Sequence, residues 1–564
     1  MRNSIIYLLI FLAVLGVLSP IVFLRTWPLT HDTSRYIVLL DHFRAAFLQG
    51  IIYPRWLPNL YGGYGYPTFL FYQPGFFYFA LPFTFLPGYP ENAIPLAVIF
   101  LFFLGTAGAY RLCKEISSDN MTALFCSLLF LLTPYLYVNF YVRGDLSELM
   151  AMLLCPWPLY FLIKLKKNIF SLKYTISLLA ALSMVFISHP ATALFFILVF
   201  CVFVIALFFD LPLASRKSFL INAAFVAIAA GILTSPYWFT IFKMKPYANI
   251  EVVTENYFLW ERHFVSVPQL FLRYREFSAS VPGRADVSFQ LGAFHFLFAL
   301  CGFVAMRRKK VIAVSFFLYL FLIFLMTPYS APLWRCIPFM KFVQFPWRIL
   351  SVTATLQVIC ACGIAALFST SFSSGRKVSL MVMLLALMLL WYSPQFKISG
   401  TLDIDASLRE AKIPEITRFD TYTAYNEFLP KAALGKTFLS SRFNTGMLSL
   451  SGSANCIPFK DNSEYRLHYQ VKAASRVVAR INQLYFPGWK VMVNGKTISS
   501  LFLEKNISED PRIFFVLPGA GDYEIEAFYD GPPGHFKHNI INAFLMTVLG
   551  VVLVYYRREL SAKA

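Results

Sequence analysis

The chain has 564 residues, of which 58% are hydrophobic and 14% are charged. Soluble domains carry about 25% charged residues, so this composition excludes an ordinary soluble protein and predicts a polytopic α-helical membrane protein. The net charge is +20, but the basic residues lie in short clusters between apolar runs, which indicates membrane topology and excludes a nucleic-acid partner.

An apolar run from Ser4 to Leu24 opens the chain and is long enough to cross a bilayer. It lacks a small-x-small cleavage pattern, so we expect a retained helix and no signal peptide. Further apolar segments of spanning length bring the expected number of transmembrane helices to about 12. They cover residues 93–110, 120–138, 149–163, 173–188, 190–209, 218–242, 290–306, 311–326, 347–368, 377–393 and 536–556.

The basic clusters fall in alternate connections between these segments, as the positive-inside rule predicts for the cytoplasmic face. Arg2 and the basic tail belong to the same face, so we expect both termini in the cytoplasm. The clustered residues are Arg111, Lys114, Lys164, Lys166, Lys167, Arg216, Lys217, Arg307, Arg308, Lys309, Lys310, Arg376, Lys377, Arg557, Arg558 and Lys563.

The first outward loop, residues 25–92, begins with LTHDTSRYIVLLDHFRAAFLQG. Its apolar residues recur with the spacing of an amphipathic helix that lies at the membrane interface. Arg35 is one turn from His31 and Asp32. These charges either form local salt bridges at the start of the helix or belong to a site on the outer face.

The same loop continues as YPRWLPNLYGGYGYPTFLFYQPGFFYF, which contains Arg55. Gly62, Gly63 and Gly65 let the backbone turn or approach another group closely. The aromatic residues suit a loop pressed into the bilayer surface, either as an anchor or as a platform for a sugar or lipid.

The second outward loop reads VNFYVRGDLSELMA. Asp145 and Glu148 are three residues apart and share one face if the next helix has begun, and Arg143 lies beside them. The pattern is equally that of a helix start, with Asp145 as the cap and Glu148 at the third position.

Three further residues stand near the outer face. His189 lies in SHPATA, at a turn between two apolar runs, where a histidine is often structural. Lys341 and Arg348 flank the stretch KFVQFPWRIL. Arg348 either extends its head group to the membrane surface or binds a phosphate through two hydrogen bonds.

Alternating apolar and polar runs separated by PGW, NGK and PGAGD turns predict a β-sandwich-like extracytoplasmic domain at 394–535, before the last helix. The expected divisions are therefore a transmembrane domain at 1–393, this β-rich domain, and a last helix with a basic tail at 536–564. Cys336 and Cys456 fall in outward segments and could pair. P-loop, GxSxG, HExxH and dinucleotide motifs are absent from the sequence.

The motifs HD at 31–32, YPRW and GYGYP at 53–67, RGDLSE at 143–148, SHPATAL at 188–194 and QFPWR at 344–348 together resemble one family. They are similar to the large bacterial membrane proteins known as "6-pyruvoyl-tetrahydropterin synthase-related", which have a GT-C-like glycosyltransferase architecture. The stretches YFPGWKVMVNGK and LPGAGDYEIEAFY resemble the C-terminal domain of YfhO-like members. The label does not imply pterin chemistry.

The resemblance implies a transferase that moves a sugar, with inversion, from a polyprenyl phosphate or diphosphate carrier to an envelope glycan, lipid or protein. It implies an active site on the extracytoplasmic face of a bacterial cell membrane. Asp32 takes the place of the family's acidic residue in the first outward loop, but its neighbour is His31 where a second carboxylate is common. Whether the enzyme uses a divalent metal therefore stays open.

These roles follow for the candidate residues. Asp32 is the expected base, and Asp145 and Glu148 orient the acceptor or support Asp32. Arg143 and Arg348 hold the carrier phosphate. The remaining substrate-binding candidates are His31, Arg35, Arg55, His189 and Lys341.

Two other functions fit part of the pattern. A transporter or flippase of lipid-linked sugars would also use many spans, but few ionisable groups lie near the span centres and the two halves of the chain show no repeat. A non-catalytic scaffold would only display the 394–535 domain to partners.

Overall fold

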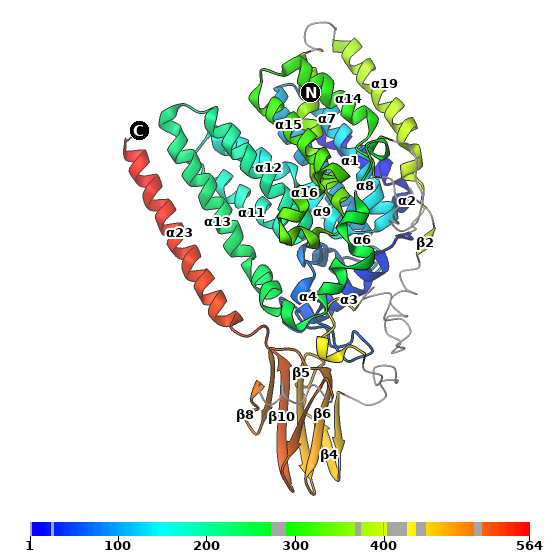
Figure 1. The fold of residues 1–564 in the computed structure, drawn as a ribbon, viewed down its shortest axis with the longest axis vertical. Coiled ribbons are helices and arrows are strands. Elements are labelled where there is room, and N and C mark those ends of the chain that lie inside the picture. The colour runs from blue at the N-terminus through cyan, green and yellow to red at the C-terminus, as the bar shows by residue number, and fades with distance from the viewer. Residues whose placement is uncertain are drawn as a thin grey trace.

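The computed structural model describes residues 3–23, 27–271, 289–366, 374–398, 400–402, 426–435, 447–500 and 510–563. Most of these residues form a bundle of helices, and two β-sheets project from one end of it (Figure 1). The polytopic helical fold with a β-rich region before the last helix is therefore confirmed.

In the described residues, 7 helical segments are long and apolar enough to cross a membrane, or up to 9 if each of 2 bent pairs is one span. Three other expected spans coincide with the shorter apolar helices α1 (Asn3–Val17), α11 (Leu172–Ser188) and α14 (Ala293–Met306). The number 12 thus stays a prediction, although helices cover most of the described residues of each expected segment.

The other bundle helices follow in chain order. They are α6 (Ala93–Ser117), α7 (Asn120–Leu131), α8 (Pro134–Tyr137), α9 (Leu146–Leu154), α10 (Pro156–Lys167), α12 (Pro190–Phe209), α13 (Leu213–Met244), α15 (Lys310–Leu325), α16 (Ala331–Cys336), α17 (Leu350–Ala361), α19 (Ser374–Tyr392) and α23 (His535–Lys563).

The span expected at 120–138 is bent, and the helix that follows the span expected at 311–326 turns sharply away from it. The segments α7 and α8 meet at 41°, and the segments α15 and α16 meet at 89°. Pro134 follows the first break and Pro328 follows the second. Proline cannot donate the backbone hydrogen bond that a continuous helix needs, so the chain turns at both places. The first bend carries a short π-helix, Val138–Arg143, into the outward loop.

The first outward loop folds into short helices under the bundle. They are α3 (Thr33–Leu48), α4 (Thr68–Phe71), α5 (Gly75–Ala80) and the 3-10 helix Leu81–Phe85, and the short helix α2 (Ser19–Phe23) precedes the loop. The amphipathic helix expected after Asp32 is α3, and its Tyr36, Leu40 and Phe43 are buried. Phe47, near the C-terminal end of this helix, is exposed and lies edge-on to the Phe85 ring.

The β-rich region contains a five-stranded sheet, ordered β4-β5-β10-β7-β8, and a three-stranded sheet, ordered β3-β6-β9. The strands are β3 (Leu448–Ser451), β4 (Ala454–Pro458), β5 (Arg466–Ala473), β6 (Val477–Leu484), β7 (Trp489–Val493), β8 (Lys496–Thr497), β9 (Arg512–Leu517) and β10 (Gly521–Tyr529). All neighbouring strands are antiparallel, as alternating sequences predict. A separate pair joins β1 (Trp27–Pro28) to β2 (Thr401–Leu402). Cys336 and Cys456 are both free and exposed.

Contacts with the first loop fix the β-sheets against the bundle. The Gln483 side chain at the end of β6 donates to the backbone oxygens of Pro58 and Gly63, at 3.2 and 2.7 Å, and accepts from the Trp56 indole at 2.7 Å. Gly65 has φ +82, and a Cβ there would collide with Gln483 and Trp56. The glycine-rich stretch is therefore needed for a close approach of two segments.

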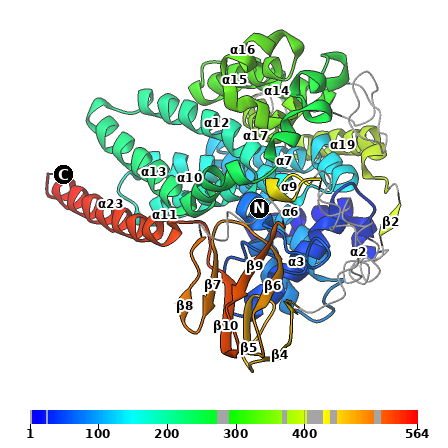
Figure 2. The same cartoon turned by 60° about the horizontal axis from the view of Figure 1, so that its bottom comes forward.

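The last helix, α23, leaves the β-sheets and packs outside the bundle along α13 (Figures 1 and 2). The imidazole of His538 stacks on Phe239 with 4.1 Å between ring centroids, and Asn542 donates to Ser235 at 2.7 Å.

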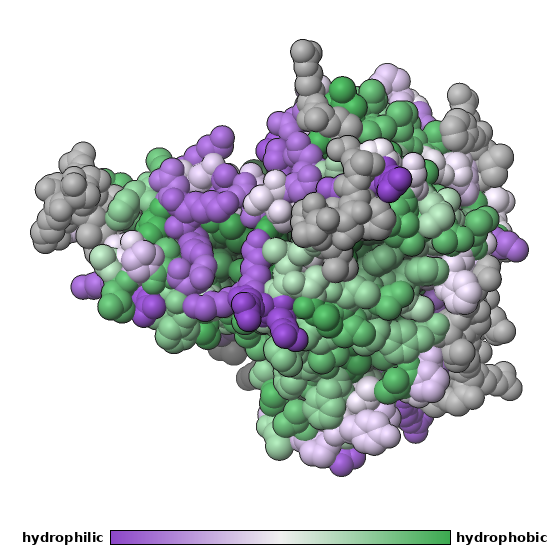
Figure 3. All heavy atoms as spheres, turned by 90° about the horizontal axis from the view of Figure 1, so that it is seen from above, coloured by the Kyte–Doolittle hydropathy of each residue, from purple (hydrophilic) through white to green (hydrophobic). Residues whose placement is uncertain are grey.

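Basic side chains gather at the end of the bundle opposite the β-sheets, where Figure 3 shows hydrophilic ridges. Lys164 and Lys167 from the end of α10 pair with Glu115 of α6, at 3.1 and 2.6 Å. Lys309, between α14 and α15, donates to the backbone oxygen of Ile116. Connections that are distant in sequence thus meet at one end, as their alternating charge predicted, and α23 also ends there (Figure 1).

Candidate functional site

A cavity of about 730 Å³ opens at the end of the bundle that faces the β-sheets. Its walls combine charged groups from the two outward motifs with aromatic side chains from later segments. The lining residues that carry the chemistry are His31, Asp32, Arg35, Tyr72, Arg143, Asp145, His189, Tyr257, Gln344, Phe345, Trp347, Arg348 and Glu427. The structure therefore brings together residues that are more than 300 positions apart in the sequence.

Backbone hydrogen bonds between the two outward motifs position Asp32. The His31 amide donates to the Val142 carbonyl at 3.0 Å, and the Asp32 amide donates to the Arg143 carbonyl at 2.9 Å. Gly144 makes this approach possible, because it has φ +67 and a Cβ there would collide with the Thr30 and Thr33 hydroxyls. The glycine of RGDLSE is thus needed to place the aspartate of the HD motif.

The Asp32 carboxylate is half-buried at the start of α3, and no described residue donates a hydrogen bond to it. Burial and the neighbouring Asp145 raise the pKa of Asp32 to about 6, although Arg35, Arg143 and Arg348 oppose the shift. Burial disfavours the charged form, and a second carboxylate adds repulsion. Asp32 is therefore a carboxylate with a free lone pair and a basicity close to neutral pH.

Arg143, Asp145 and Glu148 form a buried ion-pair network beside Asp32. The Arg143 guanidinium lies 3.0 Å from Asp145 and 2.8 Å from Glu148, and it stacks over the Trp347 ring at 4.7 Å. Tyr135 donates to Glu148 at 2.7 Å. Both alternatives for RGDLSE hold, because the Asp145 carboxylate also caps α9 by accepting from the Glu148 amide at 3.0 Å.

Asp145 is also held by Tyr36, whose hydroxyl donates to it at 3.0 Å. Burial alone would raise the pKa of Asp145, but Arg143, His189 and Arg348 hold it below its usual range. Asp145 therefore stays ionised where Asp32 titrates. The two carboxylates have opposite shifts, which is the arrangement expected when one group takes up protons and the other fixes positive charge.

Glu148 is fully buried and does not line the cavity. Its carboxylate lies 3.4 Å from the Arg348 Nε and 3.9 Å from the His189 Nε2, in addition to Arg143. Glu148 therefore orients the Arg143 and Arg348 side chains from the side that faces away from the cavity. A direct contact with the acceptor, one of its two expected roles, is not available to it here.

Arg348 reaches the cavity from the start of the last well-buried span. Its Nη1 donates to Gln344 at 2.8 Å and to the Val343 carbonyl at 2.9 Å, while no described residue accepts from its Nη2. Gln344 has φ +64, an uncommon conformation for a residue with a side chain. The strained backbone at Gln344 thus lies next to Arg348, whose Nη2 remains available to bind another group.

His189 has the structural role that its turn position suggested. Its Nδ1 lies 2.9 Å from the Thr192 hydroxyl and caps α12 by accepting from the Thr192 amide at 3.3 Å. Burial lowers the pKa of His189 to about 4, against the pull of Glu148 and Asp145, so it is neutral at pH 7. The ring still faces the cavity.

Arg35 does not form the local salt bridge that its spacing allowed. Its guanidinium pairs with Glu427 at 3.2 Å and lies 4.5 Å over the Tyr72 ring. Glu427 belongs to the segment between α19 and the β-sheets, and it was not anticipated because no motif surrounds it. This pair lets the connection to the β-sheets close one wall of the cavity.

Besides Glu148, two other candidates, Arg55 and Lys341, do not line this cavity. Arg55 lies over the Tyr53 ring at 4.5 Å in a smaller cavity of about 50 Å³ next to Trp489 and Tyr529, because its segment is drawn toward the β-sheets. Lys341 is exposed on the 3-10 helix Pro338–Val343 and lies over Phe342 at 5.4 Å. For both, closeness in sequence to a motif did not give closeness in space.

Asp145, Glu148 and His189 place one ligand atom each within 4.8 Å of one another, which is a spacing that a metal could use. However, Arg143 and Arg348 lie against the same Glu148 oxygen, at 2.8 and 3.4 Å. A divalent cation would face two guanidinium groups there, so this donor set does not fit a metal as arranged.

The comparisons with known proteins give one family. A family model described as "6-pyruvoyl-tetrahydropterin synthase related domain; membrane protein" matches residues 69–399. A search of curated proteins found no match.

Solved structures similar to this chain are GT-C-type glycosyltransferases. ArnT from Cupriavidus metallidurans, bound to undecaprenyl phosphate, has 13% sequence identity and a TM-score of 0.41 over 76% of this chain and 77% of that chain. The Archaeoglobus fulgidus oligosaccharyltransferase tethered with an acceptor peptide has 15% identity and a TM-score of 0.44, over 75% of this chain and 59% of that chain. Because both TM-scores are below 0.5, we base the function on the residues of this chain.

Proposed function

The chain belongs to the 6-pyruvoyl-tetrahydropterin synthase related family of membrane proteins, and on that premise we propose that it is a GT-C-type inverting glycosyltransferase. It moves a sugar from a polyprenyl phosphate or diphosphate carrier to an envelope acceptor on the extracytoplasmic face. The observation that carries the proposal is the single cavity that holds Asp32, with its free carboxylate and raised pKa, together with Arg35, Arg143 and Arg348.

The membrane orientation supports this location. The basic end of the bundle is the cytoplasmic end by the positive-inside rule, so the cavity and the β-sheets face the other side. A carrier lipid keeps its tail in the bilayer. Its phosphate therefore lies at the membrane surface, where we place the cavity. Apolar and aromatic walls next to the guanidinium groups, such as Phe342, Phe345 and Trp347, suit the first units of a prenyl chain.

The chemistry assigns a role to each group. Asp32 accepts the proton of the acceptor hydroxyl while the hydroxyl oxygen forms a bond to the anomeric carbon. The bond between that carbon and the carrier's phosphate oxygen breaks, and the phosphate leaves with an added negative charge. Arg348 stabilises this charge with its open Nη2. Arg143 is committed to Asp145 and Glu148, so it supplies fixed positive charge to the wall.

Other residues set the shape of the site. The pair between Arg35 and Glu427 fixes one wall, and His189 and Tyr257 add neutral groups that can meet hydroxyls of a sugar. The rings of Phe345 and Trp347 are stacked at 4.9 Å between centroids and form an apolar wall of the cavity next to Arg348 and Arg143.

The test uses the full chain reconstituted in vesicles with a polyprenyl-phosphate-linked radiolabelled sugar in one leaflet and an envelope extract as acceptor. We expect label in a new glycosidic bond and release of free carrier phosphate. Movement of the intact lipid-linked sugar between leaflets, without any new bond, would overturn the proposal in favour of a flippase. If the chain shows neither sugar transfer nor translocation, and its biological role is lost only when the β-sheets are deleted, a scaffold would be favoured.

A further inference from the structure

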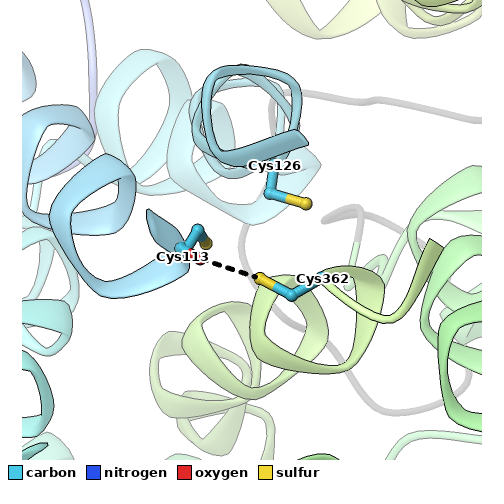
Figure 4. Close-up of side chains that lie close together, drawn as sticks. All are labelled: Cys113, Cys126 and Cys362. Atoms are coloured by element: carbon cyan, nitrogen blue, oxygen red, sulfur yellow. Dashed lines mark hydrogen bonds between the residues drawn. The ribbon is translucent and has the colours of Figure 1, made fainter. Parts of the chain in front are cut away.

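A second cluster of chemically capable side chains lies far from the cavity, near the basic end of the bundle. Cys113 of α6, Cys126 of α7 and Cys362, just after α17, turn toward one another between their helices (Figure 4). All three are fully buried, and their sulfur atoms lie within 4.8 Å of one another.

The spacing of the sulfurs is close to that of a thiolate metal site. At a zinc–sulfur distance of about 2.3 Å, three sulfurs around one ion are about 4.0 Å apart. The sulfurs therefore need to approach by less than about 1 Å, which small side-chain rotations supply. Two other buried cysteines, Cys155 and Cys360, are not part of the cluster in the described residues.

The existing contacts of the thiols are weak. The Cys362 thiol donates to the Val358 carbonyl at 3.2 Å and lies 3.9 Å from the Cys113 carbonyl, which is the dashed line in Figure 4. The Cys113 thiol is 4.0 Å from the Val358 carbonyl. A thiol is a poor hydrogen-bond donor, so the loss of these hydrogen bonds on metal binding would cost little free energy.

A cavity and a balancing charge stand beside the cluster. The cavity has a volume of about 330 Å³ at the basic end, and Ile116, one turn after Cys113 on α6, lines it together with Lys309. The Lys309 ammonium donates to the backbone oxygen of Ile116. Three thiolates and one divalent ion leave a single negative charge, which this ammonium neutralises, so the buried site need not carry net charge.

We propose that Cys113, Cys126 and Cys362 bind one thiophilic divalent cation, of which zinc is the representative, reached through the cavity at the basic end. Binding replaces three S–H protons, which leave through the same cavity, with three sulfur–metal bonds, and no oxidation takes place. Thiolates select such soft ions over magnesium or calcium. The bound ion would hold α6, α7 and the end of α17 together.

The experiment measures zinc per chain by mass spectrometry on the purified full-length protein in detergent, kept reduced, after equilibration with zinc and removal of the unbound ion. Cys113→Ser, Cys126→Ser and Cys362→Ser are compared with the buried controls Cys155→Ser and Cys360→Ser. We expect each cluster variant to hold one zinc fewer than either control.

A second chain retains only the three cluster cysteines and has the other six replaced. We expect it to bind one zinc, and to show the ultraviolet sulfur-to-metal band with cadmium in its place. Equal zinc content in cluster and control variants would overturn the proposal, and so would a monodisperse three-cysteine chain that binds less than a tenth of an ion. If the three-cysteine chain does not fold, the single-variant series decides alone.

Discussion

At the end that carries the β-sheets, Arg143, Asp145 and Glu148 are buried together beside a cavity, whereas at the opposite end Lys164, Lys167 and Glu115 pair at partly exposed positions. The Glu148 side chain is 0% exposed and the Lys167 side chain is 56% exposed. Buried charges cost desolvation energy that only close partners offset, while exposed pairs contribute little. The costly arrangement is found at the end that also holds an aspartate with a free carboxylate, which is the pattern of a functional site.

The largest effect that this comparison predicts is on turnover. Asp32→Asn removes the proton acceptor but keeps the shape of the side chain, so sugar transfer should fall by about 10²–10⁴-fold. The rate of label transfer in vesicles measures it, with thermal unfolding as the control for folding. Full activity in Asp32→Asn would remove this carboxylate from the mechanism.

The next effect concerns stability. Glu148→Gln leaves Arg143 and Arg348 without their shared carboxylate, and breaking a buried pair costs about 3–5 kcal/mol. We expect a clear fall in the unfolding temperature in detergent, together with loss of transfer. An unchanged unfolding temperature would mean that the network does not hold the site.

The variant Arg348→Lys tests whether the planar shape of the guanidinium matters in addition to its positive charge. Lysine keeps the positive charge but loses the planar pair of donors, so the KM for the carrier lipid should rise by about tenfold while the acceptor KM stays nearly constant. Steady-state kinetics with each substrate varied in turn provide the measurement. An equal rise in both KM values would point to a general distortion of the cavity.

Transfer should depend on pH through Asp32. Its pKa is raised to about 6, so the carboxylate is ionised and able to accept a proton above pH 6 and becomes protonated below it. The value of kcat/KM should therefore fall about tenfold for each unit below pH 6. A profile that stays flat down to pH 4.5 would contradict the assignment of Asp32 as the base.

The smallest effect is expected at the basic end. Glu115→Gln removes the partner of Lys164 and Lys167, but these pairs are partly solvated and contribute about 0–1 kcal/mol. The unfolding temperature and the transfer rate should both stay close to those of the unaltered chain. A loss as large as that of Glu148→Gln would erase the contrast between the two ends.

Much of the site was predictable because each key residue sits directly beside an apolar run. Asp32, Arg143, Asp145 and Arg348 follow or precede spans that can be recognised by length, and charge at such places is costly without a partner. Their side of the bundle follows from the alternating basic clusters. The order of the helices and the β-rich region could be predicted for the same reason.

The rest depended on tertiary contacts that local patterns do not encode. Glu427 lies in a polar connection with no motif, and only its pairing with Arg35 gives it a place in the wall. Arg55 shares a motif with the first loop, yet the contact between Trp56 and Gln483 draws its segment to the β-sheets. The bend before Pro134 falls within the span expected at 120–138, and the bend before Pro328 follows the span expected at 311–326.

The most direct test of the central claim is an experimental structure of the full chain with a polyprenyl phosphate bound. We expect the phosphate in the cavity of about 730 Å³, accepting hydrogen bonds from Arg348, with the Asp32 carboxylate facing the space next to it. A phosphate bound elsewhere on the chain, with this cavity closed or filled by protein, would contradict it.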